Sequence, residues 1–275
     1  MNPPVALTIA GSDSGAGAGL QADLKTFAAM GVYGTSVVTA VTAQNTSAVL
    51  GVERVDPGFV DLQLQAVLTE MPVLAVKTGM LASSATVGAV ARWAAAERLP
   101  NLVVDPVLHS STGRPLLDDD AVRSYLDLLL PHAMVVTPNL REASVLCGVP
   151  VHDEASMERA ARMLAALGPR VVVVKGGHLD DRRRAPDVVL ADGALHVLEE
   201  ERVDTVNDHG TGCTLSAATA ARLALGDSPL EAVTAAKGYV ARALRGAAGW
   251  RLGAGRGPLD HFHWTGTARP VTASS

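Results

Sequence analysis

The sequence contains few aromatic residues and few cysteines. Among its 275 residues are 3 Trp, 3 Tyr and 3 Phe, and only 2 Cys. So few rings argue against a protein that stacks nucleic-acid bases on aromatic side chains. The two cysteines, Cys147 and Cys213, form at most one disulfide and cannot make a disulfide scaffold. We therefore expect free thiols and a reducing, cytoplasmic location.

An excess of positive charge and long hydrophobic runs are also missing. The chain carries 23 Lys and Arg against 28 Asp and Glu, a formal net charge of −5. This balance argues against nucleic acid as the main partner, because neutralising phosphates needs a basic surface. Residues 1–10 have no basic residue and only a short apolar run, unlike a signal peptide. No stretch of about 20 uncharged apolar residues occurs, so we expect no membrane span.

What the sequence does have is a regular alternation of apolar runs and helical patterns. Short connections between them predict a mostly parallel sheet with helices on both faces. The expected strands are Val5–Ala10, Thr35–Ala43, Val49–Val55, Val73–Lys77, Leu102–Val104, Met134–Val136, Val171–Val174, and a hairpin of Val188–Ala191 with Leu195–Leu198. The expected helices are Leu20–Met30, Pro57–Glu70, Ser83–Arg98, Asp119–Leu130, Leu140–Cys147, Glu154–Leu167, Thr214–Leu225 and Pro229–Arg245.

The domain organisation follows from the same pattern. No linker, repeat or low-complexity spacer interrupts it, so we expect one α/β domain over residues 1–264 and a frayed tail over residues 265–275. In such sheets ligands bind beyond the carboxyl ends of the strands. The candidate site therefore lies directly after the predicted strands.

A glycine-rich loop, Gly11–Gly19, follows the first strand. Its glycines allow the backbone to approach a ligand closely. It does not match a dinucleotide-binding fingerprint, because Leu20 stands where the last glycine belongs and the next strand ends in Gln44 rather than an acidic residue. No P-loop motif occurs in the chain. A plain flexible turn is the alternative to a ligand loop.

A second candidate site is the segment Asn207–Cys213, which precedes the predicted helix Thr214–Leu225. Glycines there expose unpaired N–H groups at a helix N-terminus, which suits phosphate. Cys213 lies where a helix lowers the pKa of a thiol, so a partly ionised thiol could serve as a general base. The alternative, a tight helix start with Cys213 as packing, is equally compatible with the spacing.

A third set of polar residues follows other strands. Asp105, Asn139 and Glu142 offer two carboxylates and an amide, which suit Mg²⁺ beside phosphates. Lys175 at a strand end suits a phosphate as a point charge. Each residue has a structural alternative: Asp105 a turn, Asn139 with Glu142 a helix capping box, and Lys175 a solvated strand end.

Several motifs in order resemble the bacterial hydroxymethylpyrimidine/phosphomethylpyrimidine kinase family. The resemblance covers about residues 5–264 and rests on Leu7–Gly15, Gln21–Thr26, Thr42–Thr46, Lys77–Met80, Asp105–Val107, Thr137–Asn139, Lys175–His178, His209–Thr214 and Gly257–His263. It implies a ribokinase-like three-layer α-β-α sandwich. It also implies ATP- and Mg²⁺-dependent phosphorylation of 4-amino-5-hydroxymethyl-2-methylpyrimidine, then of its monophosphate, in thiamine biosynthesis. The family precedent is a homodimer. A pyridoxal kinase and a non-catalytic pyrimidine- or nucleotide-binding regulator are the alternatives.

The resemblance also implies roles for particular residues. Gln44 would bind the aminopyrimidine edge, since an amide offers both a donor and an acceptor. The same pocket would be lined by Gly11, Asp23, Met80 and Val107. Cys213 would be the base, and the phosphoryl group would be stabilised by Gly210, Thr211 and Gly212. Asn139, Lys175 and Thr211 would bind ATP, and Asp105 and Glu142 would hold the metal.

Three features depart from the family pattern or have no assigned role. Asp208 stands where relatives often carry an uncharged residue, and could repel phosphate, join the metal shell or face solvent. His109, in a segment expected to be a flap over the substrate, is either a phosphate contact or a tolerated surface substitution. Arg182–Arg184 is either a solvated loop or a clamp on ATP phosphates.

Overall fold

The computed structural model describes residues 2–108, 120–181 and 183–264. The expectations for His109, Arg182 and the tail lie outside these residues. The strands are β1 Val5–Ser12, β2 Tyr33–Gln44, β3 Val49–Arg54, β4 Val73–Thr78, β5 Val103–Val104, β6 Val135–Val136, β7 Val171–Lys175, β8 Asp187–Ala191 and β9 Ala194–Leu198. The helices are α1 Gly19–Ala29, α2 Pro57–Leu68, α3 Ser84–Ala95, α4 Ala121–Ser124, α5 Leu140–Cys147, α6 Glu154–Ala165, α7 Thr211–Ala224 and α8 Pro229–Ala247.

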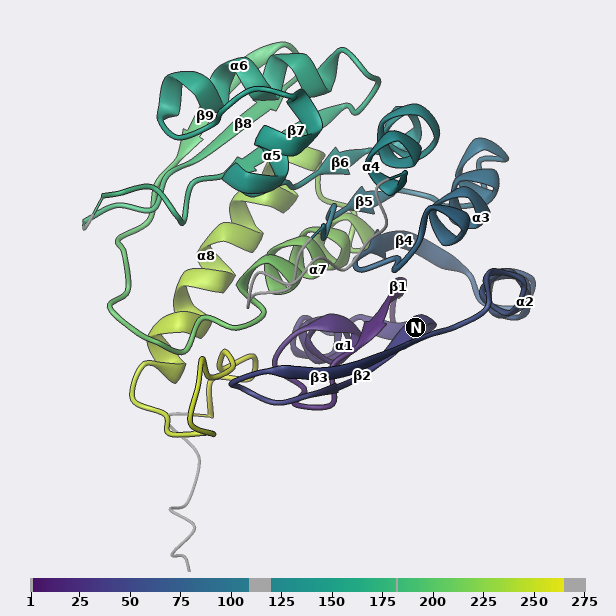
Figure 1. The fold of residues 1–275 in the computed structure, drawn as a ribbon, viewed down its shortest axis with the longest axis horizontal. Coiled ribbons are helices and arrows are strands. Elements are labelled where there is room, and N and C mark those ends of the chain that lie inside the picture. Colours follow the sequence, from purple (N-terminus) through teal and green to yellow (C-terminus); the bar gives the residue numbers. More distant parts are fainter. Residues whose placement is uncertain (1, 109–119, 182, 265–275) are drawn as a thin grey trace, which may run out of the picture.

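These strands form one sheet in the order β3-β2-β1-β4-β5-β6-β7-β8-β9. The six central strands, β2, β1, β4, β5, β6 and β7 in sheet order, pair in parallel. Strand β3 at one edge and strands β8 and β9 at the other pair antiparallel. Figure 1 shows the sheet crossing the molecule from β3 near the bottom to β8 and β9 near the top. The predicted mostly parallel sheet and the predicted hairpin are confirmed.

Strand β7 shows why the apolar runs are continuous. Val172 and Val174 pack in one hydrophobic cluster, and Val171 and Val173 pack in another on the opposite face. Side chains alternate between the two faces of a strand, so a strand covered on both faces must be apolar at every position.

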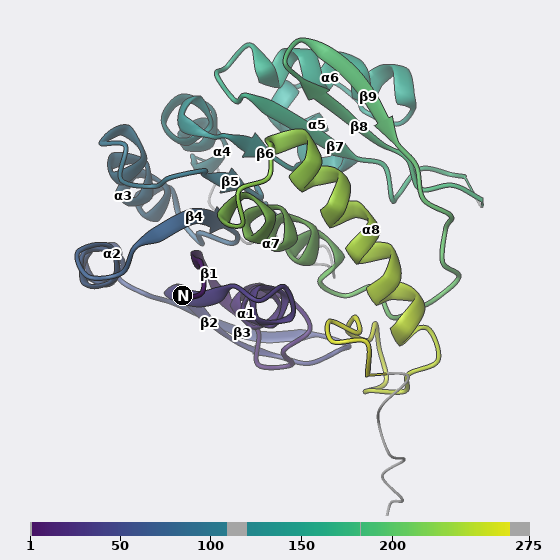
Figure 2. The ribbon, with the colours of Figure 1, turned by 180° about the vertical axis from the view of Figure 1, so that it is seen from behind.

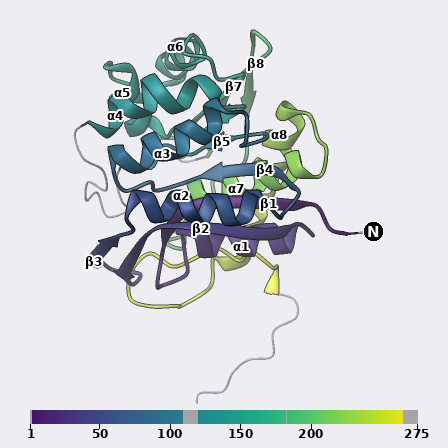
Figure 3. The ribbon, with the colours of Figure 1, turned by 90° about the vertical axis from the view of Figure 1, so that its right-hand side faces the viewer.

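The two clusters correspond to two helical layers. Helices α2, α3, α5 and α6 contribute to the first cluster, and α1, α7 and α8 to the second. In Figure 3, α4 and α5 lie on the left of the view and α8 on the right. Figure 2 shows α7 and α8 from the other side of the molecule. The predicted three-layer α-β-α sandwich is confirmed.

Most helices start or end within one to three residues of their predicted bounds, and two of the differences have a clear physical cause. Helix α7 starts at Thr211 rather than Thr214, because Gly210 caps it with φ of +88°, a conformation that favours glycine. The helix predicted to run to Leu130 is irregular: α4 is short, a π-turn follows at Tyr125–Leu129, and a 3₁₀ turn at Leu130–His132 contains a proline. Proline lacks an N–H group and cannot continue an α-helical ladder.

Among the helices of the described residues, none combines the length and the apolar character that crossing a membrane requires.

Candidate active site

A cavity of about 700 Å³ opens at the carboxyl ends of the parallel strands. This is the edge of the sheet at which the sequence places the site. The cavity brings together most of the residues singled out in the sequence: Gly11, Gln44, Met80, Asp105, Val107, Asn139, Glu142, Lys175, Gly210, Thr211, Gly212 and Cys213. They come from the ends of six strands, from the segments that follow them and from the start of α7, so the topology alone explains why they meet.

Gln44 ends β2 and lines this cavity, as do Gly11 and Met80. Gly11 has no side chain for a reason visible in the packing: a Cβ atom at this position would overlap the terminal methyl group of Met80. Among the described residues no Phe, Tyr or Trp lines the cavity, and the ring beside Gln44 is the imidazole of His209.

Asp23 does not line the cavity, so this part of the sequence prediction is wrong. Its carboxylate is fully buried and accepts hydrogen bonds from Lys77 Nζ at 2.8 and 3.0 Å and from the Thr8 hydroxyl at 2.6 Å. The side chain that reaches the cavity wall is Lys77 itself. Asp23 projects from α1 towards β4, and Lys77 lies between it and the open space.

Lys77 is a functional candidate to which the sequence assigned no role. Burial alone lowers the pKa of a lysine, but attraction to Asp23, to Cys213 when it is ionised and to Asp105 outweighs this effect and raises the pKa of Lys77. The ammonium group is therefore charged and lies beside the thiol. A lysine at the end of an otherwise apolar strand was the available signal in the sequence.

The first turn of α7 presents its backbone to the cavity. Gly210, Thr211 and Gly212 form this turn, and a side chain at Gly210 would collide with the carbonyl of Gly17 in the glycine-rich loop. The helix therefore starts in direct contact with that loop. Its N–H groups and dipole provide partial positive charge where a transferring phosphoryl group would bind.

Cys213 lies in that turn, but the predicted lowering of its pKa is wrong for the ligand-free protein. Burial raises the pKa of the Cys213 thiol to about 11, although the charge of Lys77 and the backbone N–H of Gly19 act in the opposite direction. The helix N-terminus is too small an influence to offset the loss of water around the sulfur. Both cysteines of the chain are free thiols.

Lys175, at the end of β7, is another lysine that lines the cavity. Its Nζ lies 2.9 Å from Asp105 Oδ1 and 3.9 Å from Glu142 Oε2. Asp105 also contacts the hydroxyl groups of Thr137 and Ser216, at 3.3 Å each. Burial lowers the pKa of Lys175, but the two carboxylates outweigh burial and raise it.

Asn139 and Glu142 form the capping box that their spacing predicted. The Glu142 backbone N–H donates to Asn139 Oδ1 at 3.0 Å, and the Asn139 N–H donates to Glu142 Oε2 at 2.7 Å. Burial raises the pKa of Glu142 to about 7, against the opposing effect of Lys175. Structural capping thus fixes the orientation of a carboxyl group that also faces the cavity.

Asp105 and Glu142 supply only part of the ligand set that a hard cation needs. Both are carboxylates beside Lys175, and carboxylate oxygens are ligands that Mg²⁺ prefers. In the described ranges, however, no group of three or more His, Cys, Asp or Glu side chains is arranged to hold a metal. The two carboxylates therefore suit a cation that takes its remaining ligands from nucleotide phosphates and water.

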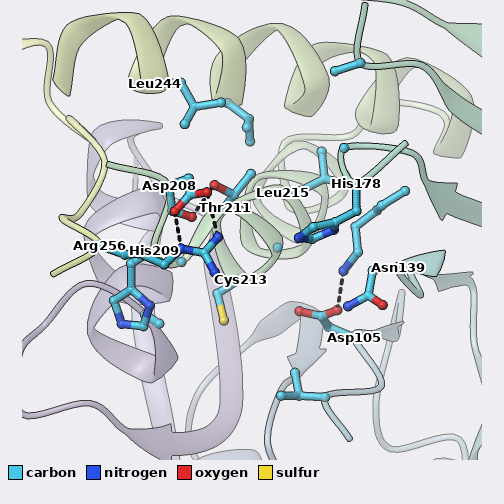
Figure 4. A pocket seen from close by; sticks show the side chains of 18 of the residues that line it. Asp105, Asn139, His178, Asp208, His209, Thr211, Cys213, Leu215, Leu244 and Arg256 are labelled. Carbon is cyan, nitrogen blue, oxygen red and sulfur yellow. Dashed lines mark hydrogen bonds and ion pairs between the residues drawn. The ribbon is translucent and has the colours of Figure 1, made fainter. Parts of the chain in front are cut away.

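Asp208 has a partner that the sequence did not reveal. Its carboxylate forms two 2.6 Å hydrogen bonds with the Arg256 guanidinium, and Figure 4 shows this pair beside Thr211 and above Cys213. The two residues are 48 positions apart, so no local pattern connects them. Asp208 also lines the cavity and its side chain is 36% exposed, so a role towards phosphate or metal stays a prediction.

Of the segment Arg182–Arg184, Arg182 lies outside the described residues and Arg184 can be placed. Arg184 is about half exposed and pairs with Asp181, Glu154 and Glu199. These contacts are with protein carboxylates at the surface, which favours the solvated-loop interpretation for this residue.

A three-layer α/β fold with a charged lysine, two carboxylates and a helix N-terminus around one cavity defines a small-molecule kinase. A family model described as phosphomethylpyrimidine kinase matches residues 13–260. The chain is 49% identical over 264 residues to a hydroxymethylpyrimidine/phosphomethylpyrimidine kinase of Rhizobium meliloti (strain 1021), covering 94% of this chain and 97% of the relative. The chain belongs to the phosphomethylpyrimidine kinase family, and the resemblance found in the sequence is confirmed.

Solved structures agree with this assignment. The phosphomethylpyrimidine kinase of Clostridium difficile 630 matches with a TM-score of 0.77 at 40% identity, over 87% of this chain and 99% of that one. The pyridoxal kinase of Staphylococcus aureus in complex with AMP-PCP and pyridoxal matches with a TM-score of 0.87 at 35% identity, over 96% and 95%. The fold is thus shared by kinases for two different rings.

Proposed function

We propose that this protein transfers the γ-phosphoryl group of ATP to the hydroxymethyl group of 4-amino-5-hydroxymethyl-2-methylpyrimidine, and then to the resulting monophosphate, in thiamine biosynthesis. The observation that carries the proposal is that Gln44, Cys213 and Lys175 open onto one cavity. An amide that can pair with an aminopyrimidine edge thus shares a site with groups that stabilise phosphate.

The residues divide the work along the cavity. Gln44 binds the amino group and the neighbouring ring nitrogen, with Gly11, Met80 and Val107 packing around the ring. Lys175, Asn139 and Thr211 hold the ATP phosphates, and Asp105 and Glu142 hold Mg²⁺, which would neutralise phosphate charge. The backbone of Gly210 to Gly212 stabilises the transferring group. Phosphoryl transfer depends mainly on such positioning and charge stabilisation.

Cys213 receives the proton of the attacking hydroxyl group. Only the thiolate can do so, and burial holds the pKa of Cys213 at about 11 in the ligand-free protein. Turnover should therefore rise with pH above neutrality, because the active base is the deprotonated form. Lys77 stabilises that form by its charge.

Replacing Cys213 tests the base. In Cys213→Ala we expect turnover to fall by about 10²–10⁴ with little change in pyrimidine affinity. Cys213→Asp supplies a base with a lower pKa, so the rise of turnover should move to lower pH. An alanine variant with wild-type turnover would remove the proposed role of Cys213.

Replacing Gln44 tests recognition of the ring. In Gln44→Leu we expect pyrimidine binding to weaken by about 1–3 kcal/mol, because polar groups of the ring lose their partners. Isothermal titration with the pyrimidine measures this directly, and the affinity for ATP serves as the internal control. Equal affinity in the variant and the wild type would mean that Gln44 does not contact the ring.

A pyridoxal kinase is the second candidate, since the Staphylococcus aureus relative binds pyridoxal. The two rings carry similar hydroxymethyl groups. Steady-state assays with Mg-ATP and each substrate separate the candidates: we expect the higher specificity constant for the pyrimidine, and a higher value for pyridoxal would overturn the proposal. A homodimeric assembly and a cytoplasmic location remain predictions from the sequence, testable by light scattering and cell fractionation.

A further inference from the structure

His209 lies between the glycine-rich loop and the residue proposed to bind the ring. Its Nε2 atom is 2.9 Å from Asp13 Oδ2 and 3.2 Å from Gln44 Nε2. The His209 and Asp13 side chains are almost fully buried, with exposed fractions of 8% and 5%. The three side chains therefore form a contact chain along the cavity wall that ends at Gln44, and this inference rests on the proposed role of Gln44.

Asp13 determines where the proton of this chain lies. Its carboxylate accepts hydrogen bonds from the backbone N–H groups of Gly15, Gly17 and Ala18, at 2.8, 3.1 and 2.9 Å. Burial raises the pKa of Asp13, but these bonds and the contact with His209 outweigh it, and the net pKa is lowered. An ionised carboxylate can only accept hydrogen bonds. A 2.9 Å contact with it requires that His209 Nε2 carries a proton.

This proton restricts the amide of Gln44. A protonated ring nitrogen cannot accept a hydrogen bond from an amide N–H group. An amide oxygen beside it can share the single Nε2 proton with Asp13 in a three-centre hydrogen bond, so the oxygen is the amide atom that fits there. A half-turn about the Cγ–Cδ bond exchanges the two amide atoms without changing the shape of the side chain.

Thr42 supports the same orientation from the other side. Its hydroxyl group donates to the Ser12 carbonyl at 2.9 Å, so a lone pair remains towards the second amide atom of Gln44, 3.5 Å away. An amide NH₂ group there faces an acceptor, whereas an amide oxygen would face another oxygen.

We propose that His209 is a positioning residue that holds the Gln44 amide with its oxygen towards His209 and its NH₂ group towards Thr42. The amide oxygen then has one lone pair left for the ligand, and the NH₂ group has one N–H left to donate. The order of this acceptor and donor along the cavity wall is fixed. The aminopyrimidine can present its amino group to the oxygen and its ring nitrogen to the NH₂ group in one sense only.

The consequence concerns the reacting group. The amino and hydroxymethyl groups are neighbours on the ring, so the order of the two amide atoms decides on which side the hydroxymethyl group lies. His209 thereby directs the hydroxyl group towards Cys213 through its effect on the Gln44 amide. Figure 4 shows His209 and Cys213 on neighbouring parts of the same pocket.

The proton on His209 is tested directly by NMR of the wild-type protein with ¹⁵N-labelled histidine. The His209 ring resonances are identified by their loss in His209→Gln. We expect Nε2 to show the shift of a protonated nitrogen, in the neutral or the fully protonated ring. An unprotonated Nε2 overturns the proposal, and this result does not depend on any kinase activity.

Two variants test the effect on the substrate. His209→Gln keeps an N–H donor near the position of Nε2, whereas His209→Met fills similar space without a donor. We expect His209→Met to raise KM for the pyrimidine about tenfold to a hundredfold. KM for ATP should stay within about twofold, and His209→Gln should restore most of the pyrimidine KM. Equal increases in both KM values, or no rescue by Gln, would contradict a positioning role.

The glycine-rich loop provides an independent perturbation. A Cβ atom at Gly17 would overlap the Cδ2 atom of His209, so Gly17→Ala displaces the ring without removing a polar group. Its effect on pyrimidine KM should resemble that of His209→Met. Gly88→Ala in α3, where an added Cβ meets no neighbour within 4 Å, is the matched control and should behave as wild type. A wild-type pyrimidine KM in Gly17→Ala would contradict the proposal.

A double-variant cycle separates this proposal from the function on which it rests. In a Gln44→Ala background, His209→Met should have little further effect on pyrimidine KM, because His209 acts through Gln44. Additive effects would overturn the positioning role. If the wild-type protein phosphorylates no pyrimidine at all, the proposed function fails, and the NMR result still decides the protonation of His209.

Discussion

Two lysines at strand ends, each paired with an aspartate, approach Cys213 from different parts of the sheet. Lys77 and Asp23 lie 2.8 Å apart and both side chains have an exposed fraction of 0%. Lys175 and Asp105 lie 2.9 Å apart, and Lys175 is 13% exposed. The residue types and distances are nearly the same. Both lysines line the cavity, but the two pairs differ in their exposure to solvent.

That difference separates a structural pair from an adaptable one. The hydrogen bonds of Lys77 Nζ go to both carboxylate oxygens of Asp23, and burial makes breaking the pair expensive. Lys175 meets Asp105 and, at longer range, Glu142, and it faces the site proposed for ATP. Because a lysine ammonium group binds anions as a point charge, Lys175 can replace its carboxylate partner with a phosphate group of ATP. The pair's surroundings, rather than its residue types, determine its function.

The largest effect should come from breaking the closed pair. Lys77→Met leaves Asp23 buried without its cation, and we expect the free energy of unfolding to fall by about 3–5 kcal/mol. Urea denaturation measures this change. The double variant Asp23→Asn with Lys77→Met removes both charges and should recover part of the loss. A loss below about 1 kcal/mol in Lys77→Met would mean that the pair is not structural.

The next effect should appear at the open pair, in activity rather than stability. Lys175→Met removes a cation from the proposed phosphate site, and we expect kcat/KM for ATP to fall by about 10²–10³. The urea midpoint should change much less than in Lys77→Met. The comparison between the two pairs fails if Lys175→Met unfolds as easily as Lys77→Met while keeping wild-type turnover.

The smallest effect concerns pH and belongs to the open pair, through Glu142. Burial raises the pKa of Glu142 from an ordinary 4.5 to about 7. Between these values the folded protein holds a proton that the unfolded chain has lost, so this contribution to stability falls as pH rises through the window and is absent above it. Wild type should lose about 1–3 kcal/mol of unfolding free energy relative to Glu142→Gln between about pH 5 and pH 8. Parallel pH profiles for the two proteins would contradict the shifted pKa.

Much of the fold could be predicted because its signals are local. Continuous apolar runs such as Val171–Val174 give buried parallel strands, since both faces must be covered. The spacing of Asn139 and Glu142 gives a capping box, because a helix start needs partners three residues apart. The edge of the sheet that carries the site follows from strand direction alone.

The errors have a common physical origin in contacts between distant segments. Asp23 was expected at the cavity, but it faces Lys77, 54 positions away. Cys213 was expected to have a lowered pKa from its place in α7, but the surrounding protein removes water and raises it. The partners of Asp208 and of His209, Arg256 and Asp13, carry no mark of the pairing in their local sequence.

The sequence by itself determined the three-layer α-β-α sandwich, the strand ends that form the site and the family to which the chain belongs. These depend on periodicity, short motifs and chain direction, which neighbouring residues specify. Only the tertiary structure decided which of the two lysines is fully buried, which ring nitrogen of His209 carries a proton and how far the pKa of the Cys213 thiol is raised. Those properties depend on burial and on charges from distant segments, which come together only when the chain is folded.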